Sequence, residues 1–197
     1  MKNVKMYLLL FLILTLCACS AKKTEEAQVT ETETAGSVVK IAVTVKDYGT
    51  FKAELYEDIA PKTVANFVSL VNDGFYDNNR FHRIIDGFMI QGGADPSGTV
   101  GHLEGEFSAN GFQNDLKHTE GVLSMARAKD MNSATSQFFV MVGDADWLDG
   151  QYAAFGKVYE GLDLVKKIAA DAKPIDNNGT IKEEEMPVIE SIRIIEE

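Results

Sequence analysis

Alternating hydrophobic and polar residues begin at position 38 and predict a series of short β-strands. The first strand buries one face, because its apolar residues recur at every second position: Val39, Ile41, Val43 and Val45. A turn at 47–49 and a second alternation over 51–56 predict an antiparallel hairpin. Further apolar runs, each bounded by Gly, Asp or Asn, predict strands at 81–85, 88–91, 121–127, 137–142, 153–159 and within 187–197.

Two segments have a helical period instead. Apolar residues after Pro61 recur at i, i+3, i+4 and i+7; the proline suits a first turn, and Gly74 is expected to end the helix. A second helix is expected over 162–172. Seven or eight short strands with only two helices favour a mainly β fold, a closed antiparallel barrel with the helices covering its open ends, because closure removes exposed strand edges.

The N-terminus has the layout of a secretory signal. Lys2 and Lys5 precede an apolar run over 7–18, which is shorter than the roughly 20 residues that a spanning helix needs. The following residues 16–19, Leu-Cys-Ala-Cys, resemble a bacterial lipobox, with Cys19 as the lipidated residue. We therefore expect a lipoprotein signal peptide at 1–18, a lipidated cysteine and flexible acidic tether at 19–37, and a folded domain at 38–197; an uncleaved membrane anchor is the alternative.

Composition and charge agree with an extracytoplasmic, lipid-anchored protein on a bacterial membrane. Residues 20–37 are rich in Thr and Glu and contain one valine and no aromatic residue, so they cannot bury enough apolar surface to fold. Both cysteines lie in the N-terminal segment, so the folded part has no thiol to oxidise. A net charge of -11 repels phosphate backbones, and we expect no nucleic acid as a partner.

Two predicted strands place glutamines beside large apolar residues. Residues two apart share a strand face, so Met89 lies with Gln91, and Gln137 lies with Phe139. A barrel interior does not favour two glutamines, and we assign both faces to the outside, where they would line a groove. The alternative is that the glutamines face water beside ordinary surface methionines. Arg83, set among apolar residues, then needs a carboxylate or a substrate to hold.

Several motifs in this order and spacing resemble the cyclophilin family of peptidyl-prolyl isomerases. They are APKTVANFVSL, FHRIIDGFMIQGG, GVLSMARA, NSATSQFFV and WLDGQYAAFGKV. The resemblance implies an eight-stranded barrel capped by two α-helices, with a groove for proline-containing polypeptides on its outer surface. The positions that match the family are Arg83, Phe88, Met89, Gln91, Ala126, Gln137, Phe139, Trp147 and Leu148.

The chain departs from many eukaryotic members at two of these groove positions. Arg127 replaces an asparagine that contacts substrate largely through its backbone, so binding should persist with an added charge. Tyr152 replaces a histidine and keeps an aromatic wall. The loop over 94–105 also differs from the usual glycine-rich sequence, which affects the groove's edge rather than the reaction.

The resemblance implies that the chain accelerates rotation about X-Pro bonds without a covalent intermediate or a cofactor. Arg83 would be the catalytic donor and Gln91 would orient it or the substrate, while the other matching residues bind the peptide. Trp147 stands where the family binds cyclosporin, so cyclosporin is a candidate ligand. The alternative is a proline-peptide-binding module or holding chaperone that is not a catalyst; intact Arg83 and Gln91 favour the enzyme.

No metal site is expected. His82 should face away from Arg83 on the same strand and be a hydrogen-bonded structural residue, and His102 and His118 read as loop residues without a second ligand at metal-binding spacing. The stretch PIDNNGTIKEEE partly resembles a calcium loop, but Pro174 occupies its first ligand position.

Overall fold

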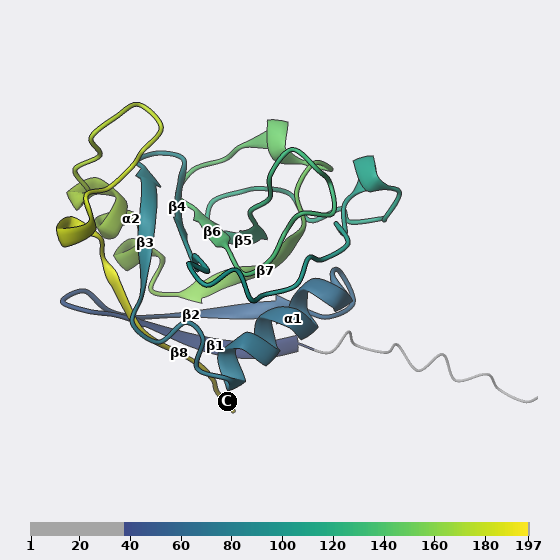
Figure 1. The fold of residues 1–197 in the computed structure, drawn as a ribbon, viewed down its shortest axis with the longest axis horizontal. Helices are drawn as coiled ribbons and strands as arrows, with labels where there is room; N and C mark the ends of the chain where they lie inside the picture. Colours follow the sequence, from purple (N-terminus) through teal and green to yellow (C-terminus); the bar gives the residue numbers. More distant parts are fainter. Residues whose placement is uncertain (1–37, 197) are drawn as a thin grey trace, which may run out of the picture. The chain divides into compact units, whose positions relative to one another are not determined.

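The computed structural model describes residues 38–196, and eight antiparallel strands form a closed barrel within them (Figure 1). The strand order around the barrel is β1-β2-β7-β5-β6-β4-β3-β8, and β8 returns to pair with β1. The strands are β1 (Val38–Val45), β2 (Gly49–Tyr56), β3 (Asn79–Ile85), β4 (Met89–Gly92), β5 (Val122–Met125), β6 (Phe138–Met141), β7 (Ala154–Glu160) and β8 (Val188–Ile194). The predicted fold class is confirmed, and the predicted strand ends differ by a few residues.

The two helices bury their apolar faces against the barrel's hydrophobic core. Helix α1 (Pro61–Asn72) contributes Val64 and Phe67, and helix α2 (Leu162–Asp171) contributes Val165 and Ile168. The N-terminus of α1 has an unpredicted cap: both carboxylate oxygens of the buried Glu106 accept hydrogen bonds, from the backbone N–H groups of residues 62 and 63. A carboxylate at this end also complements the helix dipole.

Within the barrel, aromatic side chains from distant segments pack together. Phe138 of β6 makes edge contacts with Phe67, Tyr76 and Phe81, at ring-centroid distances of 5.2, 5.5 and 6.2 Å. Three short 3₁₀ helices, η1 (Ser108–Asn110), η2 (Asp146–Leu148) and η3 (Glu183–Glu185), lie in the connections. Figure 1 shows the long teal and green connections gathered along one side of the barrel.

A second, smaller hydrophobic cluster covers the outer face of β4, β5 and β6. Met89 and Met141 are only 1% and 0% exposed in this cluster, while Ile90 and Val140, their strand neighbours, belong to the barrel core. The alternation read from the sequence therefore holds in both strands. The alternative in which these methionines lie on an ordinary exposed surface is wrong, because both are buried in a cluster with Ala145 and Leu148.

Among the residues described here, no helix has both the length and the apolar composition needed to cross a bilayer. The predicted signal segment, Cys19 and the tether lie outside the described residues.

Candidate active site

A cavity of about 200 Å³ opens on the outer face of the barrel beside Arg83. This volume is below the roughly 300–1,000 Å³ of drug-sized ligand pockets, so it suits a single side chain of a peptide. Nine of the eleven predicted site residues line it: Arg83, Phe88, Met89, Gln91, Ala126, Arg127, Phe139, Leu148 and Tyr152.

The two remaining predicted residues lie next to this cavity. Gln137 lines a neighbouring cavity of about 300 Å³, which shares Gln91, Ala126 and Arg127 with the first. Trp147 is 65% exposed, and its ring lies 5.8 Å from that of Phe88 at an interplanar angle of 37°. The structure thus places all eleven residues along one surface.

The Arg83 guanidinium is held by neutral oxygens rather than by a carboxylate. Its Nη1 donates to Gln91 Oε1 at 3.1 Å, and its Nε donates to the backbone oxygen of Asn178 at 2.7 Å. Within residues 38–196, no carboxylate forms an ion pair with it. The positive charge therefore remains available to a bound molecule.

The two glutamines form a chain of side-chain hydrogen bonds that ends at Arg83. Gln91 Nε2 donates to Gln137 Oε1 at 2.9 Å, which leaves Gln91 Oε1 facing the guanidinium. The amide of Gln91 is thereby fixed with its acceptor toward Arg83. The sequence led us to expect that Gln91 orients either Arg83 or the substrate; the hydrogen bond by which Gln137 holds Gln91 was not predicted.

His82 does not lie where strand alternation predicts. The register between β3 and β4 shifts between Phe81 and Arg83, as in a β-bulge. Phe81 and Ile84 both point into the core, and the two residues between them both line cavities on the outer surface. The prediction that His82 faces away from Arg83 is therefore wrong. Its Nδ1 is buried without a hydrogen-bond partner in the described part of the chain, whereas its ring has a side-chain hydrogen bond with Gln137, as expected of a hydrogen-bonded histidine.

The guanidinium of Arg127 donates its hydrogen bonds to backbone oxygens of the protein. Its Nε and Nη2 both donate to the backbone oxygen of Gln151, at 3.0 and 2.9 Å, and its Nη1 donates to that of Ala128. The guanidinium lies 4.6 Å from the ring centroid of Tyr152 and 5.1 Å from that of Phe107. The two departures from the common eukaryotic pattern therefore contact each other, and Arg127 ties two rims of the cavity together.

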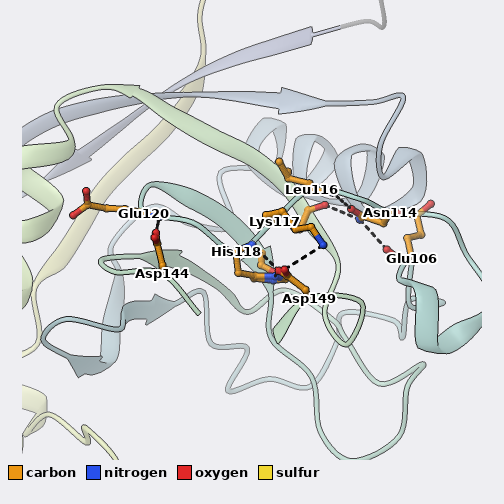
Figure 2. A network of polar contacts seen from close by, with 10 residues as sticks. Glu106, Asn114, Leu116, Lys117, His118, Glu120, Asp144 and Asp149 are labelled. Atoms are coloured by element: carbon orange, nitrogen blue, oxygen red, sulfur yellow. Dashed lines mark hydrogen bonds and ion pairs between the residues drawn. The ribbon is translucent and has the colours of Figure 1, made fainter. Parts of the chain in front are cut away.

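Behind Phe139, on the side away from the cavity, lies a buried group of polar side chains that includes His118 and Asp149 (Figure 2). His118, 2% exposed, stacks on Phe139 at 6.1 Å and 20°, and its Nδ1 lies 3.1 Å from Asp149 Oδ1. Figure 2 shows Asp149 between His118 and Lys117, whose Nζ lies 3.4 Å from the other carboxylate oxygen. His118 is a loop residue, as predicted, but the sequence carried no signal for its burial or for this contact.

His118 also approaches Ser124, and the three residues have the order of a Ser-His-Asp triad. His118 Nε2 lies 3.0 Å from Ser124 Oγ. Ser124 is 0% exposed, however, so no substrate reaches its hydroxyl. The arrangement satisfies buried polar groups behind Phe139 and does not support nucleophilic catalysis.

The His118 contacts predict how stability depends on pH. Burial lowers the pKa of His118 below its ordinary value, although the hydrogen bond that Asp149 accepts from it acts in the opposite direction, so the unfolded chain binds this proton more readily. We expect the urea midpoint to fall as pH drops from 7.5 through 6.5 to 5, and burial of His82 acts in the same direction. In a His118→Asn variant the fall should be smaller; an equal fall would assign it to other groups.

The eight-stranded barrel with two helices is the fold of cyclophilin-type peptidyl-prolyl isomerases, and sequence comparisons agree. The profile of the family described as "Cyclophilin type peptidyl-prolyl cis-trans isomerase/CLD" matches residues 39–195. The chain belongs to this family.

Individual relatives match over most of the folded region. Peptidyl-prolyl cis-trans isomerase B of Escherichia coli is 38% identical over 158 residues, covering 76% of this chain and 96% of that protein. A Neurospora crassa protein named peptidyl-prolyl cis-trans isomerase-like 1 is 46% identical over 124 residues, covering 61% of this chain and 75% of that protein. A crystal structure of a Cryptosporidium parvum cyclophilin type isomerase superposes with a TM-score of 0.69 at 30% identity, covering 82% of this chain and 99% of that one.

A second crystal structure of the Cryptosporidium parvum protein was determined in the presence of the dipeptide Ala-Pro. It has a TM-score of 0.68 at 30% identity and covers 80% of this chain and 99% of that one.

In the part of the chain that the structure describes, no group of three or more His, Cys, Asp or Glu side chains is arranged to hold a metal ion.

Proposed function

We propose that the cavity beside Arg83 is where this peptidyl-prolyl isomerase rotates X-Pro bonds, and that its clients are exported or surface proteins. The observation that carries the site assignment is a guanidinium, free of any carboxylate within the described residues, at the edge of an apolar cavity sized for one side chain. A crystal structure of a relative with the same fold was determined in the presence of the dipeptide Ala-Pro, which supports a proline-sized occupant.

Rotation about an X-Pro bond needs only an apolar cavity and a correctly placed hydrogen-bond donor. Rotation of a peptide bond crosses a barrier of about 18–20 kcal/mol, and no covalent bond breaks. In the twisted transition state the amide loses resonance, its nitrogen gains a lone pair and its carbonyl loses part of its negative charge. An apolar wall of Phe88, Met89, Phe139 and Leu148 therefore favours the twisted form over the more polar planar one.

Arg83 supplies the hydrogen-bond donor for the developing lone pair. Because a guanidinium does not lose its proton in proteins, the donor is present at every physiological pH. Gln91 and Gln137 set its direction before the substrate arrives, so little reorganisation is needed during the reaction. Backbone groups near Ala126 hold the flanking peptide in an extended form.

A coupled-protease assay on a short proline peptide tests the enzyme against the binding-module alternative. The enzyme accelerates isomerisation at concentrations far below those of the peptide, whereas a binding module only sequesters it in proportion to its own concentration. Absence of turnover in the full-length chain would contradict the proposed function.

Lipid anchoring through Cys19 explains how the isomerase would meet exported clients. Two acyl chains give the stable membrane attachment that one chain does not. We expect Cys19→Ser to move the full-length protein from the membrane fraction to the soluble fraction or to leave its precursor unprocessed. Cys17→Ser is the matched control and should fractionate as the parent does. Equal behaviour of the two variants would contradict lipidation at Cys19.

Cyclosporin is a candidate ligand of the same surface through Trp147. Because this ring is exposed and lies against Phe88, its removal takes away ligand contact without opening the core. We expect cyclosporin to inhibit the isomerase, and Trp147→Ala to raise the inhibitor concentration for half-inhibition by about tenfold, in line with the weight of a buried aromatic contact. Titration of inhibition on one peptide substrate checks this, and an unchanged value would place the ligand elsewhere.

A further inference from the structure

The segment Asp176–Thr180, which the sequence presents as an incomplete calcium loop, lies along the edge of β3 beside Arg83. Strand β8 pairs only with Asn79 and Arg80 at the start of β3. Residues 178–181 continue the edge from there: Ile84 N donates to Gly179 O at 2.8 Å, and Ile181 N donates to His82 O at 3.1 Å. An isolated antiparallel bridge joins Arg83 to Thr180.

We propose that the segment Asp176–Thr180 is a positioning element of the active site, which aims the Arg83 guanidinium through the backbone oxygen of Asn178, with Asp176 and Gly179 as its positioning residues. This inference rests on the proposed function, in which Arg83 is the catalytic donor. It assigns a role in catalysis to a stretch that lies more than 80 residues from Arg83 in the sequence.

Two hydrogen bonds on different nitrogens fix the plane of the guanidinium. Gln91 alone would hold Nη1 and leave the group free to swing about that contact. The bond from Nε to Asn178 O, at 2.7 Å, removes this freedom. Among the residues described, Nη2 has no hydrogen-bond partner and Arg83 lines the cavity, so the N–H groups of Nη2 remain available to a molecule bound there.

Gly179 permits the close approach that this bond requires. Its φ is +86°, and a Cβ added there would lie 2.5 Å from the backbone oxygen of Ile84 and 2.5 Å from Ile85 Cγ1. Any side chain would therefore push the segment away from β3. Gly111 has a similar φ of +81°, but a Cβ added there would have no other atom within 4 Å. An alanine at position 111 therefore introduces the same backbone strain without the steric clash.

Asp176 shapes the turn that presents the Asn178 oxygen. Its Oδ1 accepts from the backbone N–H groups of Asn178 at 2.9 Å and Thr180 at 3.1 Å. These bonds, chiefly the one from Thr180, lower the pKa of the Asp176 carboxyl. Because the oxygen acts as an acceptor, an asparagine at this position keeps the turn, whereas an alanine does not.

The test compares Gly179→Ala with Gly111→Ala, and Asp176→Ala with Asp176→Asn, in the full-length chain. A small misplacement of a catalytic group costs up to about a hundredfold in rate, so we expect Gly179→Ala to lower kcat/KM by about 10- to 100-fold. The loss should fall on kcat with KM nearly unchanged, because no residue of the segment lines the cavity. Asp176→Ala should lower kcat at least about threefold and Asp176→Asn should restore it.

Arg83→Ala, alone and combined with Gly179→Ala, separates the possible failures. If the segment acts through Arg83, the double variant is no less active than Arg83→Ala alone. If Arg83→Ala is itself fully active, the proposed function fails. If Arg83→Ala is impaired but Gly179→Ala matches Gly111→Ala, or adds its full loss to that of Arg83→Ala, the positioning role alone is overturned. The arginine Nε–H resonance in ¹H–¹⁵N spectra gives a direct readout, and it should change in Gly179→Ala.

Discussion

We expect Arg83→Ala to lower kcat/KM on a proline peptide by on the order of a hundred- to a thousandfold, the loss found when one pre-aimed donor is removed from an active site. The apolar walls of the cavity do not depend on Arg83, so the loss should appear mainly in kcat. The urea midpoint should fall only modestly, because the guanidinium loses two hydrogen bonds but belongs to no ion pair among the described residues.

Arg80→Ala is the matched control for this prediction. Arg80 lies on the same strand and also donates to a backbone oxygen, that of Glu183, but it lines a different cavity. It makes the same chemical change away from the site and should leave kcat/KM unchanged. Because no titrating group takes part, parent activity should be nearly flat from about pH 6 to 8. Full activity of Arg83→Ala, or a steep profile in that range, would remove Arg83 from its role.

Much of the fold could be predicted because the barrel obeys simple periodicities. In β6, Phe138 and Val140 belong to the barrel core while Phe139 and Met141 belong to the outer cluster, as a period of two requires. The helix that starts at Pro61 was readable from its apolar spacing and its proline. These features are local, so one sequence contains them.

Features that depend on distant segments could not be predicted in this way. The bulge at His82 adds one residue to β3 and changes which side chains face outward, and no residue type in the strand announces it. The cap on α1 comes from Glu106, 43 residues away from the N–H of Thr63. Both depend on how separate segments meet.

The same limit applies to the candidate site. The residues that line the cavity could be predicted from the two-residue period of the strands and from the family resemblance, and nine of the eleven predicted residues meet at one cavity. The supports behind that lining did not follow: His118 stacks on Phe139 only because a loop folds back over β6, and Asn178 reaches Arg83 through its backbone, which carries no signature in the side-chain sequence.

The register of β6 leads to the second large prediction, which sets two adjacent phenylalanines against each other. Phe138 is 0% exposed among the aromatic rings of the barrel core, and truncating such a residue typically costs about 3–5 kcal/mol. We expect Phe138→Ala to lower the free energy of unfolding by this amount, while the fraction that remains folded keeps most of its kcat/KM. Urea denaturation and activity, both measured at low temperature, check the two parts.

Phe139→Ala should affect activity far more than its neighbour does. The ring lines the cavity, with Tyr152 at 6.0 Å on its edge, and its loss removes apolar contact with the prolyl ring. Burial of one apolar side chain is worth roughly 1.5–3 kcal/mol, so kcat/KM should fall by about 10- to 100-fold. Some stability is lost as well, since the ring is 5% exposed; the discriminating quantity is therefore kcat/KM of the folded fraction. If Phe138→Ala lost the greater activity per folded molecule, the outer face of β6 would not be the catalytic face.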